Sequence, residues 1–471
     1  MSLKEQFISS TIYVAITKYS SILIGLIIVA ILSRLLTPDD FGTVAIVSVL
    51  VVFFNLLGSL GIAPAVIQKK DLSKQDISII FSFTILVGLI LALIFFSLSS
   101  LISSFYSQSV LKNICKLFSI SILFACINLV PDALLLKEKQ FKFLMFRQLL
   151  IQLICGMLGI WTALIGWGIY ALLVHSISSI VFTFLVNYIR YPIKIAKINI
   201  LSLKKIASYS MYQFLFGFIN YFSRNMDKLL IGKFLSSAAL GYYEKSYRLM
   251  LLPVDNLTHI FTPAIQPFFS EFQDDKKRIY NSYLKIVQLL ALIGFPLSVL
   301  LHFSAEELIL IIFGGQWINS IPVFRILAWS TGIQIILSSS GSIFQAANDT
   351  KKLFLSGFLS ALLIIAAICI GVFFYKNLET VAYTLLCAFS IIFFQSYYIL
   401  ITKTLKQPLT PFFKQLFTPL LLAIEVFVVE FLFSKYIEID NIYLSLIAKV
   451  GIFGIIFLPI ILRQKSKLFW W

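Results

Sequence analysis

Residues 77–102 read ISIIFSFTILVGLILALIFFSLSSLI and contain no charged side chain. The run is longer than the roughly 20 apolar residues that a helix needs to cross a membrane. Continuous apolar runs of this kind recur along the whole chain of 471 residues. Strands of a transmembrane barrel would instead alternate apolar and polar residues. The repeated pattern therefore predicts an all-α integral membrane protein.

The overall composition is that of a membrane protein rather than a soluble one. Hydrophobic residues make up 59% of the chain and charged residues 13%, against about 45–50% and about 25% in soluble domains. This excludes a disordered chain, a coiled coil and a soluble α/β enzyme. About fourteen spans are expected by length, near residues 11–33, 42–67, 77–102, 111–136, 144–166, 168–189, 209–231, 239–269, 283–303, 321–345, 353–375, 379–402, 411–434 and 443–462.

The net charge of +17 mostly reports orientation. Lys and Arg gather in alternate loops, such as those holding Lys69, Lys70 and Lys74, Lys137, Lys139 and Lys142, or Lys351 and Lys352. Basic loops lie on the cytoplasmic side of a membrane. The pattern predicts an even number of spans and both termini in the cytoplasm. Anionic lipid is a sufficient partner for these charges, so no nucleic acid is expected.

A weak internal repeat divides the chain. Residues 31–42, ILSRLLTPDDFG, align with residues 230–241, LIGKFLSSAALG, at an offset of 199 residues (42 to 241). In the same register Pro64 aligns with Pro263, and Arg34 with Lys233. Transporters are often built from such repeats, with the substrate site between them. We predict an N-terminal lobe (1–189), a cytoplasmic linker (190–208), a C-terminal lobe (209–402), and spans thirteen and fourteen with a tail (403–471).

One polar stripe follows predicted span seven. Its members recur every three or four residues, which places them on one helix face: Gln213, Gly217, Asn220, Arg224 and Asp227. Arg224 and Asp227 are spaced to form an i,i+3 ion pair. Lys228 adds a second positive charge beside them.

Spans eight and one carry further polar faces. In span eight the face comprises Glu244, Arg248, Asp255, His259 and Thr262, and in span one Lys18 shares a side with Ser21 and Gly25. Two interpretations are open: ion pairs that tie helices together, or the lining of a water-filled cavity. Because charges inside a membrane are costly, many of them together favour the cavity. A net positive cavity suits an anion such as a phosphate or pyrophosphate.

The sequence predicts no metal site and no catalytic residues. The five Cys and three His are too scattered for ligand spacing, and no large loop offers a catalytic face. No cofactor is expected. Transport could be coupled to a Na⁺ or H⁺ gradient or to the membrane potential, with Asp227, Glu244 and Asp255 as ion-coupling candidates. Glu425 and Glu430 in span thirteen are either proton sites or lipid-side residues near the interface.

Several motifs resemble one family of transporters. They are residues 32–42, LSRLLTPDDFG; 60–68, LGIAPAVIQ; 224–235, RNMDKLLIGKFL; 240–249, LGYYEKSYRL; and 272–275, FQDD. Together they are similar to the Wzx-type polysaccharide exporters, the oligosaccharide flippases of the multidrug/oligosaccharidyl-lipid/polysaccharide exporter superfamily. The resemblance covers nearly the whole chain in its number of spans and repeat layout.

The resemblance implies two six-helix lobes around a central cavity, two added C-terminal helices and alternating access across the bacterial inner membrane. The implied substrate is an undecaprenyl-pyrophosphate-linked oligosaccharide for O-antigen, capsule or exopolysaccharide synthesis, with polymerase machinery as a partner. Basic residues hold the pyrophosphate in such families, which by position points to Lys18 and Arg224 here, with Lys228 and Arg248 as further candidates. A cation-coupled drug antiporter like the MATE proteins is the alternative. A membrane polysaccharide polymerase or ligase is the least favoured interpretation.

Overall fold

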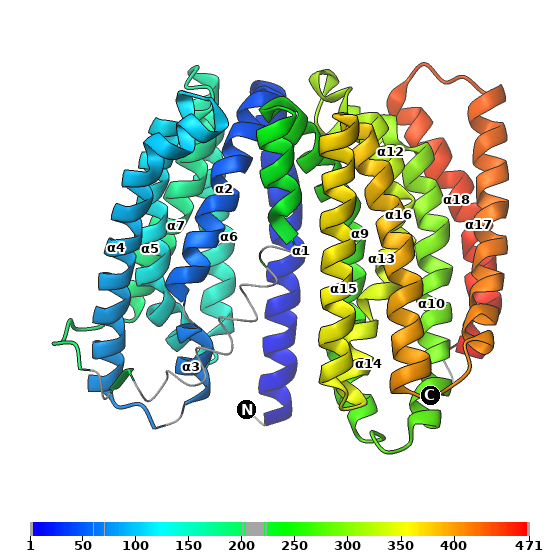
Figure 1. The fold of residues 1–471 in the computed structure, drawn as a ribbon, viewed down its shortest axis with the longest axis horizontal. Helices are drawn as coiled ribbons and strands as arrows, with labels where there is room; N and C mark the ends of the chain where they lie inside the picture. Colours follow the sequence, from blue (N-terminus) through cyan, green and yellow to red (C-terminus); the bar gives the residue numbers. More distant parts are fainter. Residues whose placement is uncertain are drawn as a thin grey trace. The chain divides into compact units, whose positions relative to one another are not determined.

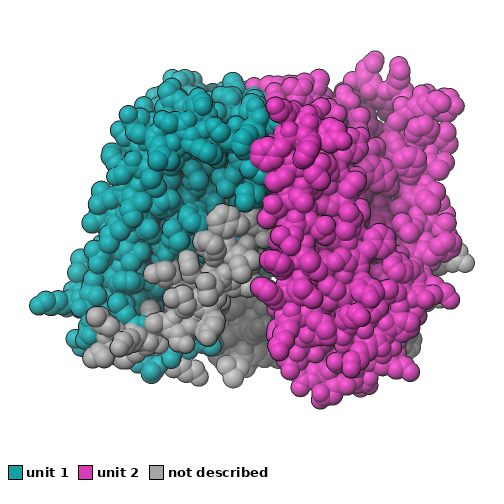
Figure 2. Space-filling view, viewed as in Figure 1, with its two compact units in different colours: residues 1–241 teal, residues 242–471 magenta. Residues whose placement is uncertain are grey.

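The computed structural model describes residues 3–59, 61–69, 71–199, 202–203, 221 and 224–468. Side chains are described for these residues except 3–11, 259–264, 266–267 and 460–468. All the secondary-structure elements of this described part are helical (Figure 1). The fold class is therefore the predicted one. Contacts divide the chain into two compact units, Met1–Gly241 and Tyr242–Trp471 (Figure 2).

Up to Arg190, the described part of unit 1 is built from six long helices and the short α3. They are α1 (Leu3–Leu35), α2 (Pro38–Ser59), α3 (Ile62–Gln68), α4 (Lys74–Tyr106), α5 (Val110–Lys137), α6 (Phe141–Leu164) and α7 (Tyr170–Arg190). Helix α4 packs along α5 and α6 along α7, while α1 packs on α6. The apolar run at 77–102 forms the body of α4, and its start is set by a capping box. There the Ser73 hydroxyl accepts from the Asp76 N–H (3.1 Å) and the Asp76 carboxylate accepts from the Ser73 N–H (3.0 Å).

The predicted second span, 42–67, is two helices rather than one. The chain breaks at Gly61, whose φ of 68° lies in the left-handed region that favours glycine. The short α3 that follows is fastened to α5, because the Lys137 ammonium donates to the carbonyl oxygen of Val66 (2.8 Å) and to that of Lys69. Apolar spacing alone did not reveal this break, since both helices are apolar.

The two copies of the internal repeat meet in a reciprocal contact at their glycines. A Cβ atom on Gly42 would overlap the carbonyl oxygen of Ser237, and one on Gly241 would overlap the carbonyl oxygen of Pro38. Each glycine of one copy thus faces the residue four positions before the glycine of the other. Small residues allow backbones to approach this closely in membrane helices. The alignment at residues 31–42 and 230–241 therefore has a structural counterpart.

Most of unit 2 is a second set of packed helices. They are α9 (Ser237–Ser270), α10 (Lys276–Phe303), α11 (Ala305–Ile312), α12 (Ser320–Ala328), α13 (Ser330–Ser338), α14 (Ser340–Ala346), α15 (Thr350–Cys369), α16 (Leu378–Tyr398), α17 (Thr410–Tyr436) and α18 (Ile442–Leu468). Helix α10 packs against both α13 and α17. Short π-helical segments at Ile370–Tyr375 and Ile399–Thr404 extend α15 and α16.

Predicted span ten, 321–345, is bent rather than straight. The axis turns by 50° between Ser320–Ala328 and Ser330–Ala346. Near the bend Gly332 lies against Gly294 of α10, so that a Cβ on Gly332 would lie 2.7 Å from the Gly294 carbonyl oxygen. The N–H of Gly332 donates to the Ser298 hydroxyl (2.7 Å). A partner helix thus satisfies a backbone group beside the bend, as membrane interiors require.

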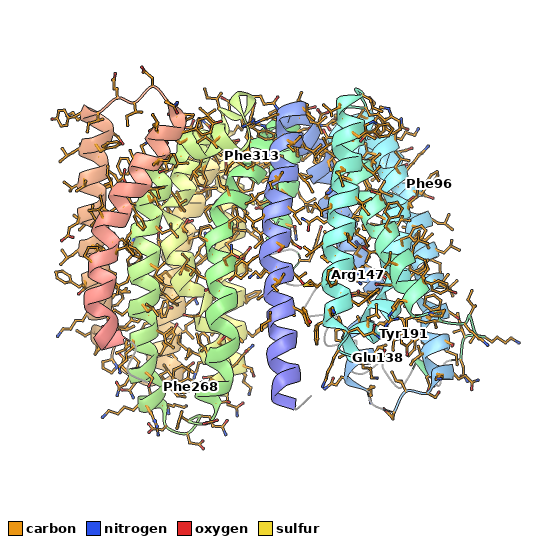
Figure 3. All side chains as sticks on the ribbon, turned by 180° about the vertical axis from the view of Figure 1, so that it is seen from behind. Phe96, Glu138, Arg147, Tyr191, Phe268 and Phe313 are labelled. Atoms are coloured by element: carbon orange, nitrogen blue, oxygen red, sulfur yellow. The ribbon has the colours of Figure 1, made fainter. Side chains whose placement is uncertain are left out.

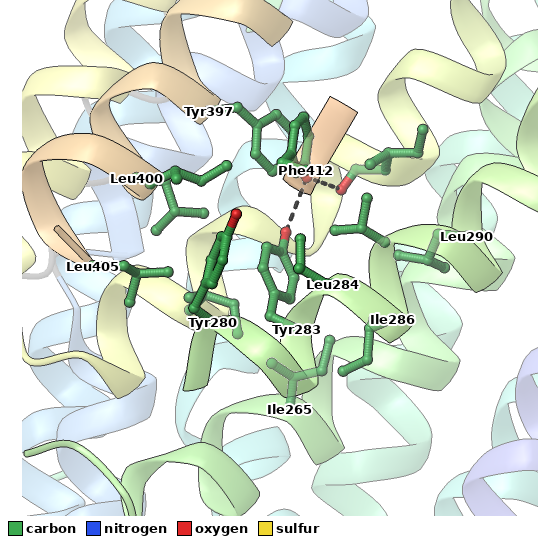
Figure 4. Close-up of a cluster of buried hydrophobic side chains, with 14 of the residues drawn as sticks. Ile265, Tyr280, Tyr283, Leu284, Ile286, Leu290, Tyr397, Leu400, Leu405 and Phe412 are labelled. Atoms are coloured by element: carbon green, nitrogen blue, oxygen red, sulfur yellow. Dashed lines mark hydrogen bonds between the residues drawn. The ribbon is translucent and has the colours of Figure 1, made fainter. Parts of the chain in front are cut away.

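The core of unit 2 contains a buried pair of tyrosines (Figure 4). The Tyr283 hydroxyl lies 2.9 Å from that of Tyr397 and 2.8 Å from that of Ser339, and the Tyr397 hydroxyl donates to the Ile336 carbonyl oxygen (2.9 Å). Both rings are fully buried among leucines, isoleucines and Phe412. The pair ties α10 and α16 to α13.

The count of fourteen spans is not confirmed. In the described part of the chain eleven helices are long and apolar enough to cross a membrane, or twelve with the bent pair. Predicted span seven, 209–231, lies mostly outside the described residues. Helix α9, the predicted span eight, is long but is not one of the eleven, because polar residues lower its mean hydropathy. The lobe boundaries at 189, 208 and 402 stay predictions.

The reciprocal glycine contact predicts a strong effect of a single methyl group. Gly42→Ala and Gly241→Ala should each lower the melting temperature of the purified protein, since overpacking costs about 1–3 kcal/mol. Gly357→Ala in α15 is the matched control, because its Cβ would meet no atom within 4 Å. Equal melting temperatures for Gly42→Ala and the control would contradict the contact.

The tyrosine pair predicts a cost for removing one hydroxyl group. Tyr397→Phe leaves the Ile336 carbonyl oxygen without this donor and should destabilise the protein by about 1–3 kcal/mol. Tyr398→Phe changes the neighbouring tyrosine, which is exposed, and should have little effect. Chemical or thermal unfolding of the two variants measures the difference, and a Tyr397→Phe protein as stable as the control would be inconsistent with the bonded pair.

Candidate functional site

The predicted basic residue of span one, Lys18, is half-buried on α1. The face that it shares with Ser21 and Gly25 packs on α6. There the Gln152 amide nitrogen donates to the Ser21 carbonyl oxygen (2.8 Å) and lies 3.2 Å from the position of a Cβ on Gly25. At Ser21 and Gly25 this side of α1 is therefore a polar helix contact, and Gln152 is a member that the sequence analysis missed.

The predicted stripe of span seven is described from residue 224 onward, where residues 224–234 are helical. Arg224 is exposed, Lys228 is half-buried and Asp227 is buried. The Asp227 carboxylate accepts from the N–H of Lys228 (2.8 Å). Within the described residues Arg224 and Asp227 form no ion pair, so the guanidinium keeps its charge available on the surface of unit 1. Gln213, Gly217 and Asn220 lie outside the described residues.

The predicted stripe of span eight lies on α9 of unit 2. Arg248 and Asp255 are exposed and Glu244 is half-buried, while the side chains of His259 and Thr262 lie outside the described residues. The neighbouring Lys245 points the other way. It is 4% exposed, and its ammonium lies 5.2 Å from the ring centroids of Phe313 and Trp317. The two aromatic rings contribute attraction to this buried ammonium group.

A polar network inside unit 1 was missed by the sequence analysis. It centres on Arg147, which is labelled in Figure 3. The Arg147 guanidinium on α6 donates to the Asp132 carboxylate of α5 (2.7 Å) and to the Asn187 side-chain oxygen of α7 (2.6 Å). The Asn187 amide in turn donates to Asn128 (2.9 Å) and Asp132 (3.2 Å). Arg147 lies near the start of predicted span five, 144–166, next to the basic loop that holds Lys142. The i,i+4 pair Asn128 and Asp132 was the signal that could have found the network.

The cations thus divide into two kinds. Arg147 and Lys245 are buried against fixed partners inside their units and contribute to packing. Arg224 and Arg248 are exposed on helices of an otherwise apolar protein. A site for an anion needs charges of the second kind, because the first are already neutralised or enclosed. No group of three or more His, Cys, Asp and Glu among the described residues could hold a metal ion.

A comparison with protein-family models finds one match. Residues 31–322 match the family described as "Polysaccharide biosynthesis protein". The matched region begins at the first copy of the internal repeat and includes the second copy, Arg224 and Arg248. It covers more than half of the chain.

Curated relatives are similar over most of their length. The lipopolysaccharide biosynthesis protein WzxC of Escherichia coli (strain K12) is 25% identical over 386 residues, covering 79% of this chain and 76% of the relative. The succinoglycan biosynthesis transport protein ExoT of Rhizobium meliloti (strain 1021) is 23% identical over 450 residues, covering 93% and 89%.

A solved structure shares the fold. The lipid II flippase MurJ, in an inward closed conformation, superimposes with a TM-score of 0.76 at 15% sequence identity. The match covers 97% of this chain and 100% of that structure. The fold is therefore that of a known class of membrane transporters.

The Asp132–Arg147 pair predicts how single and double variants differ in their free energy of unfolding. Asp132→Ala should lower the free energy of unfolding by about 2 kcal/mol or more, because Arg147 is left buried without its carboxylate. Adding Arg147→Met should recover part of the loss. Asp71→Ala, at an exposed acid in the same unit, serves as the control. A double variant less stable than Asp132→Ala alone would contradict this account of the network.

Proposed function

The chain belongs to the polysaccharide biosynthesis protein family, and we propose that it is a flippase for an undecaprenyl-pyrophosphate-linked oligosaccharide. It carries the substrate from the cytoplasmic to the periplasmic leaflet of the bacterial inner membrane. The family, the relatives named for glycan biosynthesis and transport, and the transporter fold support this function over an enzymatic one. The glycan then enters O-antigen, capsule or exopolysaccharide synthesis, where polymerase machinery acts on it.

The observation that carries the proposal is the exposed charge of Arg224. A positive charge at the centre of a bilayer costs about 2.5–3.5 kcal/mol on insertion scales. An arginine on a helix of this protein therefore needs water or an anion beside it. Its guanidinium can bind two phosphate oxygens at once, which suits a pyrophosphate head group better than the neutral sugars behind it.

We assign the pyrophosphate to Lys18 and Arg224, both in unit 1, with Lys228 of the same unit as a further contact. Arg248, in unit 2, stays a separate candidate by its exposed charge. Gln213, Asn220 and His259 would supply hydrogen bonds to the substrate. Asp227, Glu244 and Asp255 are the acidic residues that could take part in ion coupling. Exposed charge supports the role of Arg224, whereas the roles of Gln213, Asn220 and His259 rest on their positions in the sequence.

The proposed orientation has both termini in the cytoplasm. It is supported by the grouping of basic residues at the ends of helices. In unit 1 Lys137 and Lys69 meet where α3 and α5 end. In unit 2 the Lys352 ammonium binds both Asp349 (2.6 Å) and the Lys403 carbonyl oxygen (2.6 Å). Both groups belong to the loops that the positive-inside rule assigns to the cytoplasm.

The antiporter alternative predicts different chemistry. A drug antiporter binds cationic substrates and would favour an acidic cavity. The exposed charged residues of the two stripes are instead two arginines, Arg224 and Arg248, and one acid, Asp255. Deleting the gene should then raise drug sensitivity without changing surface glycan. Loss of glycan with unchanged drug sensitivity is the result expected of the flippase.

The pyrophosphate assignment predicts the effect of charge removal. Arg224→Ala and Lys18→Ala should abolish surface glycan in a complemented deletion strain, while immunoblots show normal membrane insertion. Arg224→Lys should retain part of the export, because a point charge still attracts phosphate after the two-pronged contact is lost. Lys112→Ala, at an exposed lysine of α5, is the control. Wild-type export by both alanine variants would refute the assignment.

A further inference from the structure

A buried ion pair joins three helices of unit 2 at one of their ends. Lys449 of α18 forms an ion pair with Glu307, in the first turn of α11. The same ammonium donates to the carbonyl oxygen of Phe303, the last residue of α10 (2.8 Å), and the Ser445 hydroxyl donates to Glu307 (2.6 Å). Both charged residues are at least nine-tenths buried.

A second carboxyl group lies beside this pair. Glu430 of α17 is completely buried, and neither of its carboxyl oxygens has a hydrogen-bond partner in the structure. It follows Val426 by one helical turn, and Val426 belongs to an apolar cluster with Leu422 and Val299. Glu307 also has one buried oxygen without a partner. The helix presents a carboxyl group where an apolar side chain would pack.

The charges around Glu430 do not balance if every group is ionised. Lys449 from α18 and Glu307 from α11 are the charged groups close enough to act on it. On α10, the titratable residue nearest to Phe303 along the chain is His302. Its ring lies against those of Phe303 and Trp329, and its Nδ1 lies 3.0 Å from the Arg325 carbonyl oxygen. Two carboxylates and one ammonium leave one uncompensated negative charge.

One bound proton removes this imbalance at low cost. An ionised carboxylate without a partner is very unfavourable in an apolar interior, and such a group takes up a proton instead. A sodium ion would need several oxygen ligands around it, whereas a proton needs a single carboxylate oxygen. The proton adds to a carboxylate oxygen of Glu430 and leaves the Lys449–Glu307 pair intact.

We propose that Glu430 is a proton-binding site that couples proton movement to transport, with the coupling resting on the proposed flippase function. The carboxyl is neutral while α17 and α18 are packed on α10 and α11. Its release of the proton leaves a net negative charge there and favours separation of these helices. Glu430 lies six residues before the end of α17, about 9 Å along the helix axis. In the proposed orientation this is the extracytoplasmic end, where protons are supplied.

Infrared spectroscopy of the protein in lipid nanodiscs tests the site directly. At about pH 6, where an exposed glutamate is ionised, the wild type should show a carboxylic-acid C=O band that Glu430→Gln removes and Glu430→Asp shifts in frequency. Glu425→Gln changes an exposed carboxyl of the same helix and should leave the band. If the Glu430 variants leave the band unchanged, the proposal is overturned. It is also overturned if replacing choline with Na⁺ changes the band while a change of pH does not.

A second readout does not depend on the band. Because glutamine resembles a protonated glutamic acid, Glu430→Gln should keep the wild-type melting temperature at pH 6, whereas Glu307→Gln should lower it by leaving Lys449 without its carboxylate. Equal losses in both variants would mean that Glu430 is an ionised partner of Lys449, against the proposal.

The coupling is measured separately from the site. In proteoliposomes, a pH gradient should accelerate transfer of the lipid-linked glycan by the wild type but not by Glu430→Gln. Equal acceleration of both overturns the coupling. If no form transfers glycan while the infrared band titrates as expected, the proposed function fails and the proton site stands.

Discussion

A hydrocarbon layer offers no hydrogen-bond partner and no counter-ion, and the whole structure depends on that constraint. Each backbone polar group must be satisfied by the protein itself, which is why apolar runs such as 77–102 become helices. The same constraint acts where a helix bends. At the bend of α12 and α13 the N–H of Gly332 is satisfied by Ser298 of a neighbouring helix. At the C-terminal end of the short α3, Lys137 at the end of α5 binds the carbonyl oxygens of Val66 and Lys69.

Charge follows the same rule, and the partners of a charge indicate its role. Arg147 with Asp132, and Lys245 with Phe313 and Trp317, are enclosed and tie helices together. Arg224 is exposed and is the charge that a pyrophosphate can use. Glu430 is enclosed but has no bonded partner, which distinguishes it from both groups and marks it as a proton site. The three cases differ in burial and in hydrogen bonding, although all are ionisable residues in apolar helices.

Much of the fold could be predicted from the sequence, because the length of apolar runs is a strong signal. The break at Gly61 and the bend between Ala328 and Ser330 could not, since an apolar run looks the same in sequence whether its helix continues, bends or ends. The Arg147 network was missed because its members are far apart in sequence and Arg147 sat near a predicted loop. Glu425 and Glu430 were indistinguishable by sequence, and only packing shows that one is exposed and the other buried. The stripe at Gln213 and Asn220 stays a prediction, because those residues lie outside the described part of the chain.

The central claim is that this protein moves a lipid-linked oligosaccharide from one leaflet to the other. The most direct measurement reconstitutes the purified protein in liposomes with an undecaprenyl-pyrophosphate oligosaccharide and follows the glycan's accessibility to an external glycosidase or lectin. With the wild type, glycan that is initially protected in the inner leaflet should become accessible, and protein-free liposomes should keep it protected. The assay uses lipid-linked glycans of the host's own surface polymers. If these glycans stay equally protected with and without the protein, the result contradicts the account.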